Sequence, residues 1–237
     1  MRSTALHLML VIIQGVLVTS FAEARDDARP TLVVRTYEVT PVQTSSWSAA
    51  VGAAGTLLDH AGIHVEWVHC SSQRAGDSES GPARCTLPFA RNEVVLRIVK
   101  QPMAGPRDQI LLGDSMIDGS SHSGMLATIY LDRVERLADD AHVSHAIVLA
   151  RTMAHELGHL VLGTNTHSRH GLMRPAWTAD ELSRNRAIDW IIPAAEGARM
   201  RQRLRRRIDS PVLTRMIDGC PASDSSARSH SCSKPTS

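Results

Sequence analysis

Two histidines and a glutamate stand close together in the segment His155-Glu156-Leu157-Gly158-His159. Residues four apart share one face of an α-helix, so both imidazoles could bind the same metal ion, with a carboxylate beside it. An H-E-x-x-H pattern is expected by chance only about 0.02 times in a chain of this composition. The pattern predicts a metal centre rather than two packed core histidines, because burying such polar rings without a partner is costly.

A helix must position these residues, and the surrounding sequence predicts one. Residues 147–162 are apolar on nearly every face of such a helix, which is typical of a buried element. We expect the helix to begin near Ser144. It should end at Gly163, because glycine readily takes the left-handed conformation that follows many helices.

The segment after this helix supplies candidates for a third ligand. Catalytic zinc sites use three protein ligands and leave one coordination position open. His167 lies just past the expected turn, and we predict it as the third ligand, with His170 and Glu181 as alternatives. Met173 follows in a tight segment that contains Gly171.

From the histidine pair onward the chain resembles the metzincin zinc peptidases. Their pattern is H-E-x-x-H-x-x-G-x-x-H followed by a turn that contains methionine. The pair His167-Ser168, with Met173 and Pro175 beyond it, is most similar to the matrixin branch. The resemblance implies a zincin-like fold, bound Zn²⁺ and a role for Met173 as an apolar floor beneath the histidines.

The spacing to the third histidine departs from the family pattern. Gly163 lies four residues after His159 rather than three, and His167 lies four residues after Gly163 rather than three. Asn165, a poor zinc ligand, stands where the family has its third histidine. The loop must therefore be one residue longer on each side of the glycine for His167 to reach the metal.

Three neutral histidines would leave a zinc ion its full double charge. The expected activity is that of a secreted zinc-dependent endopeptidase, in which Glu156 is the general base that activates a zinc-bound water to hydrolyse peptide bonds. An alternative is a catalytically inactive zinc-binding protein of peptidase ancestry that binds peptides or a partner. A metal-dependent hydrolase of a non-peptide substrate is a third possibility. Glu156 favours catalysis, because a binding protein needs no base at that position.

The predicted fold class is α+β, a zincin/metzincin-like twisted mixed sheet of about four strands. The predicted strands are rich in β-branched residues or alternate apolar with polar side chains, and they cover residues 31–39, 63–68, 94–99 and 125–131. The resemblance implies that the last of these is the sheet edge that binds an extended peptide. Between the last two strands, residues 101–124 are rich in glycine and are predicted as a long loop.

The helices expected around the active-site helix follow from apolar spacing and capping residues. Ser46 should cap the first helix and Thr178 a short later one. The other two predicted segments are a short helix or turn over 132–138 and a C-terminal helix over 196–208. In the C-terminal helix, six arginines between Arg199 and Arg207 surround an apolar stripe. We expect the stripe to dock and the arginines to lie in solvent, with a site for an anionic surface or a nucleic acid as the alternative.

Residues 1–24 have the features of a secretory signal peptide: an early arginine, an apolar run from Ala5 to Val18 and a small-x-small end at Ala24. The apolar run is shorter than the ~20 residues of a membrane span. We therefore expect a secreted or periplasmic protein with no stable membrane association after cleavage. Residues 25–210 would form the zinc metallopeptidase-like domain, and the polar residues 211–237 a disordered tail.

The four cysteines and the overall charge complete the prediction. An even number of cysteines in an exported chain favours disulfides, and pairing of sequence neighbours joins Cys70 to Cys85 and Cys220 to Cys232. The net charge of +2 implies no particular partner, and no nucleic-acid partner is expected. The expected partner is a peptide or protein substrate, and the expected state is a monomer.

Overall fold

The computed structural model describes residues 29–70, 83–100 and 111–210. The predicted signal peptide, the predicted disordered tail and the second cysteine pair lie outside these residues. No helix in the described part of the chain is long and apolar enough to cross a membrane.

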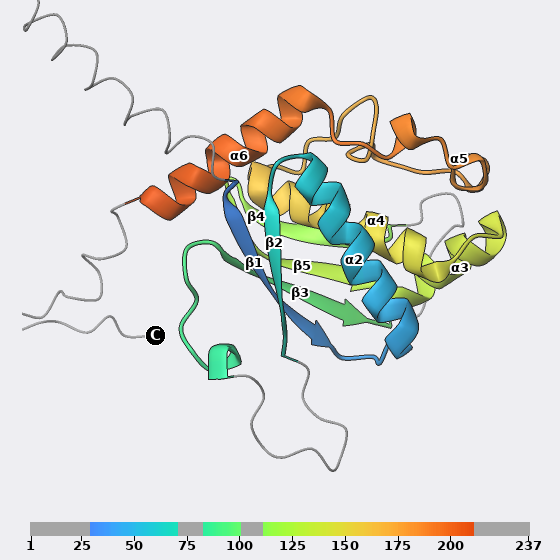
Figure 1. Cartoon of the computed structure of the whole chain (residues 1–237), viewed down its shortest axis with the longest axis horizontal. Coiled ribbons are helices and arrows are strands. Elements are labelled where there is room, and N and C mark those ends of the chain that lie inside the picture. Colours follow the sequence, from blue (N-terminus) through green and yellow to red (C-terminus); the bar gives the residue numbers. More distant parts are fainter. Residues whose placement is uncertain (1–28, 71–82, 101–110, 211–237) are drawn as a thin grey trace, which may run out of the picture.

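A five-stranded mixed sheet forms the centre of the molecule (Figure 1). The order across the sheet is β2-β1-β3-β5-β4, and all neighbouring strands are parallel except β4, which runs antiparallel to β5. The strands span Thr31–Glu38 (β1), His64–His69 (β2), Glu93–Val99 (β3), Gly113–Asp118 (β4) and Ser123–Tyr130 (β5).

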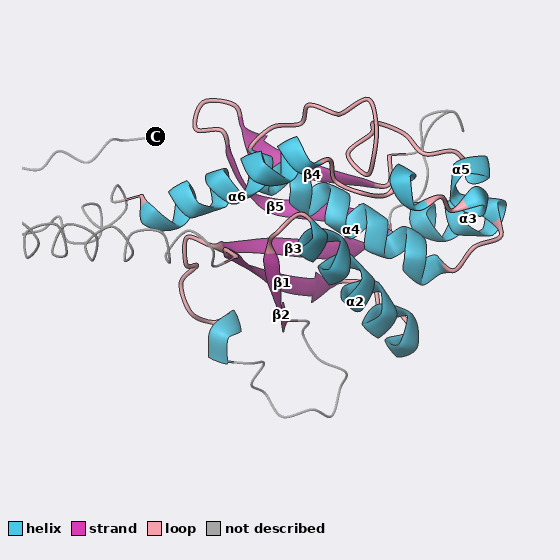
Figure 2. Cartoon of the chain, turned by 45° about the horizontal axis from the view of Figure 1, so that its top comes forward, coloured by secondary structure: helices cyan, strands magenta, loops and turns pink. Residues whose placement is uncertain are grey.

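Helices cover one face of this sheet, with α2 and α4 side by side across it (Figures 1 and 2). Alternate residues of β1 such as Leu32 and Val34 join the helical core, while Val33 packs on the opposite face with Cys70. The helices span Thr44–His60 (α2), Leu131–Ala141 (α3), His145–Leu162 (α4), Ala179–Arg184 (α5) and Ala194–Asp209 (α6), with short 3₁₀ turns at Ala83–Cys85 (η2) and Ala187–Asp189 (η3).

The central helix α4 follows the sequence prediction closely. Its N-cap is Ser144, and Gly163 ends it in the left-handed conformation at φ 63°. A side chain at Gly163 would also place its Cβ 1.8 Å from the carbonyl oxygen of His122, so both the backbone angle and the space require glycine there. Almost every residue of α4 is buried, because the sheet, α2, α3 and α6 all pack against it.

The sheet corrects the prediction in two places. There are five strands rather than about four, because β4 forms inside the segment predicted as a loop. β5 is therefore an inner strand, and β4 is the edge in place of the predicted strand over residues 125–131. Thr44 begins α2 with Gln43 as its N-cap, so Ser46 is not the cap. The segment predicted as a short helix or turn over 132–138 is helical, and the helix α3 is longer than predicted, from Leu131 to Ala141.

On the face opposite the helices, a disulfide and an ion-pair network hold the sheet. The predicted Cys70–Cys85 disulfide is confirmed. Glu93 accepts hydrogen bonds from Arg35 at 2.5 Å and from Arg84 at 2.8 Å, with both the Arg35 and Glu93 side chains almost fully buried. Burial alone would raise the pKa of Glu93, but hydrogen bonds from the Ala90 amide and the two arginines together hold it below its ordinary value.

Helix α6 docks through arginines as well as through its apolar stripe, which corrects the prediction that all its arginines lie in solvent. Arg201 donates to the Ala61 carbonyl at 2.7 Å. Arg207 donates to the carbonyls of Gly124 and Glu93 at 3.1 and 3.0 Å. The predicted apolar stripe is buried at Met200 and Leu204 but exposed at Ile208.

Candidate functional site

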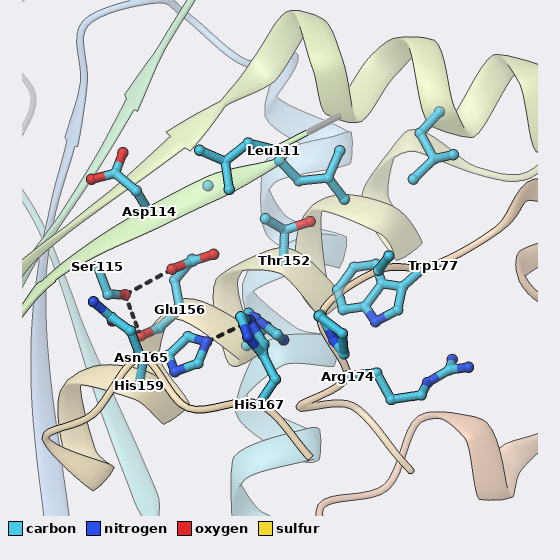
Figure 3. A pocket seen from close by; sticks show the side chains of 16 residues that line it. Leu111, Asp114, Ser115, Thr152, Glu156, His159, Asn165, His167, Arg174 and Trp177 are labelled. Carbon is cyan, nitrogen blue, oxygen red and sulfur yellow. Dashed lines mark hydrogen bonds between the residues drawn. The ribbon is translucent and has the colours of Figure 1, made fainter. Parts of the chain in front are cut away.

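Three histidines from two elements meet above the middle of α4. His155 and His159 project from one face of the helix, and His167 comes from the loop that follows it. One ligand nitrogen from each ring lies within 4.8 Å of those of the other two. In Figure 3 the side chains of His159 and His167 lie next to one another, with Glu156 above them. This arrangement could hold a metal ion.

The alternative third ligands do not join this cluster. His170 is exposed, and the one group of histidines in the described residues that could hold a metal ion does not include it. Glu181 instead forms a capping box with Thr178 at the start of α5 and an ion pair with Arg174. Asn165, at the family's usual ligand position, lines the cavity beside the histidines.

Backbone carbonyls orient both helical histidines. His155 Nδ1 lies 2.9 Å from the Leu172 carbonyl oxygen, and His159 Nδ1 lies 2.8 Å from that of Thr164. A carbonyl oxygen only accepts, so each Nδ1 carries the hydrogen and each Nε2 presents a lone pair. The two Nε2 atoms are 3.0 Å apart. Two lone pairs at this separation repel, and a cation between the rings removes the repulsion.

Burial keeps these imidazoles neutral. It lowers the pKa of His155 to about 3, with the neighbouring His159 adding to the effect, and it also lowers the pKa values of His159 and His167. Neutral imidazole nitrogen is a preferred ligand of zinc, which binds it at about 2.1 Å. A histidine set with its Nε2 atoms 3.0 Å apart therefore fits such an ion.

Met173 packs against α4 between the two helical histidines. Its side chain is 1% exposed and packs against α4 at Gly158, where an added Cβ would stand 2.6 Å from the Met173 sulfur. Gly171 turns the chain at φ 76°, and a Cβ there would lie 2.3 Å from the Ile191 carbonyl oxygen. The turn thus brings Met173 under the helix and the Leu172 carbonyl to His155.

The edge strand β4 holds the carboxylate of Glu156. Ser115 Oγ lies 2.7 Å from Glu156 Oε2 and 2.9 Å from the Glu156 carbonyl oxygen, so its single hydrogen can be donated to either (Figure 3). Burial raises the pKa of Glu156 to about 7, the Ser115 hydrogen bond opposes this rise, and the charge of Asp114 adds to it. A side chain at Gly113 would collide with Glu156, because its Cβ would lie 2.8 Å from Glu156 Cγ.

These parts surround a cavity of about 680 Å³. One wall is β4 from Gly113 to Ser115, the floor is α4 with its histidines and glutamate, and Trp177 closes the far side. The Trp177 ring stands at 89° to that of His155, with centroids 5.6 Å apart. Sequence reasoning missed Ser115 and Trp177. The one signal in the sequence was the run Gly113-Asp114-Ser115 in the predicted loop, and such a run is too common in loops to indicate a functional site.

No protein-family model and no curated protein matches the sequence. Among solved structures, the fold is similar to archaemetzincin from Methanopyrus kandleri, with a TM-score of 0.48 and 15% identity over 74% of this chain and 97% of that one. It is also similar to metalloproteinase-II from Bacteroides fragilis, with a TM-score of 0.48, 14% identity and 75% of this chain covered. The chain spans about half, 54%, of the length of that second protein. The matrixin-like spacing remains a prediction.

Proposed function

We propose that this protein is an exported zinc-dependent endopeptidase in which His155, His159 and His167 hold the ion and Glu156 is the general base. The observation that carries the proposal is the pair of Nε2 lone pairs 3.0 Å apart, each fixed by a backbone carbonyl on the other side of its ring. A second observation is the buried carboxylate on the same helix face, in a cavity large enough for a peptide segment.

Zinc, when bound, lowers the pKa of a water molecule and polarises a substrate carbonyl. Glu156 accepts a proton from water at a carboxylate oxygen and returns it to the leaving amine. Ser115 fixes Oε2 of that carboxylate from the edge strand. Oε1 has no hydrogen-bond donor among the described residues, so it is the oxygen available to accept the proton.

The free edge of β4 orients the substrate. Among the described strands β4 pairs with β5 alone, so an extended peptide can add to its other side through backbone hydrogen bonds. The absence of a side chain at Gly113 leaves room for Glu156 beside this edge. A peptide bound at this sheet edge would therefore present a carbonyl to the histidine cluster.

Export and substrate class are part of the proposal. The Cys70–Cys85 disulfide is a feature of proteins that fold in oxidising compartments, which supports secretion or a periplasmic location. A peptide or protein is the substrate that strand addition selects. The protein is proposed to act as a monomer.

The decisive experiment compares the zinc-loaded wild type with Glu156→Gln on a mixed peptide library read by mass spectrometry. The amide keeps the shape of the carboxylate but cannot take a proton, so we expect cleavage to fall by about 10²–10⁴-fold while zinc stays bound. Asp180→Asn, an acid-to-amide change on the exposed part of α5, is the matched control and should cleave normally. If the fully loaded wild type cuts nothing, the zinc-binding-protein alternative replaces the proposal.

A further inference from the structure

A second hollow, of about 1250 Å³, lies beside the metal-binding cavity. It is bounded by α6, by the turn between β4 and β5 and by the loop after α4. Arginines dominate its lining, so we name it the arginine groove. They are Arg91, Arg199, Arg203, Arg206 and Arg207.

The positive charge of the arginine groove is largely uncompensated. One carboxylate, Glu196, lies in its lining, with Arg199 Nη2 3.7 Å from Glu196 Oε1. Arg203 and Arg206 are exposed, and no carboxylate within the described residues pairs with either. Arg207 is held by backbone carbonyls rather than by an acid. Five cations against one anion make the groove a binding site for negative charge.

The groove adjoins the candidate active site at His167. His167 lines both hollows, and Thr164 and Thr166 of the same loop line the groove. Thr164 is also the residue whose carbonyl orients His159. An extended chain that follows β4 past the histidine cluster can therefore continue over His167 toward the arginines.

We propose that the arginine groove binds aspartate or glutamate side chains of the substrate on one side of the scissile bond. The inference rests on the proposed peptidase function and names its substrate class: peptides with an acidic segment next to the cleavage site. Arginine suits this task because its planar group binds carboxylates through two parallel hydrogen bonds.

A peptide fits the groove better than a nucleic acid. Proteins that bind single strands place several aromatic rings for base stacking. Among the described lining residues, Phe89 is the one large aromatic side chain. The shared His167 also connects the groove to a strand edge, which recognises a polypeptide backbone rather than a sugar-phosphate one.

The test measures binding of a fluorescent acidic peptide to zinc-loaded Glu156→Gln protein, which would bind without cutting. A second peptide carries asparagine and glutamine in place of the acids. The groove variant carries Arg203→Gln and Arg206→Gln in addition to Glu156→Gln. The matched control carries Arg136→Gln and Arg184→Gln in addition to Glu156→Gln; these two arginines are exposed on α3 and α5 and line neither cavity.

We expect the acidic peptide to bind about tenfold more tightly than its amide counterpart. The groove variant should lose that preference and the control should keep it. Raising the salt concentration to 1 M should remove most of the preference as well, because the Debye length falls from about 10 Å at 0.1 M to about 3 Å. In the wild-type peptide library, acidic residues should be enriched on one side of the cut.

Equal affinity for the two peptides, or a preference that survives in the groove variant, would overturn the inference. So would an oligonucleotide that displaces the peptide in the parent protein as strongly as excess acidic peptide does, because the groove would then be a nucleic-acid surface. A different result would contradict the proposed peptidase function without contradicting this inference. If acidic binding is selective and depends on Arg203 and Arg206 but the wild type cleaves no peptide, the groove stands as a binding site and the peptidase assignment does not.

Discussion

Replacement of Gly158 by alanine tests whether Met173 supports the metal centre. Gly158 lies on α4 between the two helical histidines, with its missing side chain directed at Met173. An added Cβ would stand 2.6 Å from the Met173 sulfur and 3.0 Å from its methyl carbon, closer than carbon atoms pack. Met173 is 1% exposed, so its side chain cannot swing into solvent to relieve the collision.

Two opposing effects determine how far Gly158→Ala changes the free energy of unfolding. Overpacking a buried site costs about 1–3 kcal/mol. Removing a glycine from the interior of a helix stabilises the fold by about 0.5–1 kcal/mol. The collision outweighs this gain, so the free energy of unfolding of Gly158→Ala should fall by about 1–2 kcal/mol. Displacing Met173 also moves the adjacent Leu172 carbonyl that orients His155, and loss of such an outer contact typically weakens metal binding about 10–100-fold.

The assay combines denaturant unfolding of the metal-free protein with zinc competition against a chelator. Gly52→Ala is the matched control, because a Cβ on Gly52 in α2 meets nothing within 4 Å; this variant should be as stable as the wild type or slightly more so. Met173→Ala added to Gly158→Ala removes the colliding atoms, so it should recover part of the zinc affinity. If Gly158→Ala alone binds zinc and unfolds like the wild type, the reasoning about the methionine floor is wrong.

Three further outcomes follow from the site and the sheet. His167→Ala should lose one equivalent of bound zinc, measured by metal analysis after dialysis, whereas His170→Ala should retain it; the reverse result would exclude His167 as the third ligand. Ser115→Ala should keep its zinc but cleave peptides about tenfold more slowly, because one hydrogen bond to the Glu156 carboxylate is lost; unchanged cleavage would remove Ser115 from the mechanism. The folded-state pKa of Glu93 lies below 4.5, so its stabilising contribution is present above that pH and lost as the pH falls through the folded value. In urea unfolding of metal-free protein, Glu93→Gln should show a weaker loss of stability below pH 4.5 than the wild type, and equal slopes would contradict this role.

The sequence predicted α4 well because the signals for that helix are local. Its apolar surface, its N-cap at Ser144 and its left-handed end at Gly163 each depend on neighbouring residues alone. The pairing of Cys70 with Cys85 was equally accessible, since the two are close in sequence. Features set within one segment can be inferred from its residues.

The edge strand β4 could not be inferred in this way. Gly113–Asp118 contains a single β-branched residue, and its extended form depends on pairing with β5. Missing that strand led to two further errors: β5 was assigned as the edge, and Ser115 was overlooked as the partner of Glu156. The third histidine was an intermediate case, because loop spacing allowed His167 but the closure of the loop decides which side chain reaches the cluster.

The hydrogen bonds that orient the helical histidines are accepted by main-chain carbonyl oxygens, and this affects how the site can change over evolution. Any residue at the positions of Leu172 and Thr164 supplies the same carbonyl oxygen to the imidazole. The side chain of Thr164 can therefore be replaced while the geometry of the histidines is retained, and the fully buried Leu172 can be replaced by another apolar residue of similar size. Apart from a few side chains such as the histidines, the glutamate and the tightly packed glycines, such a site imposes little requirement on the sequence. Descendants of one ancestor could thus keep the same chemistry after their sequences have diverged beyond recognition.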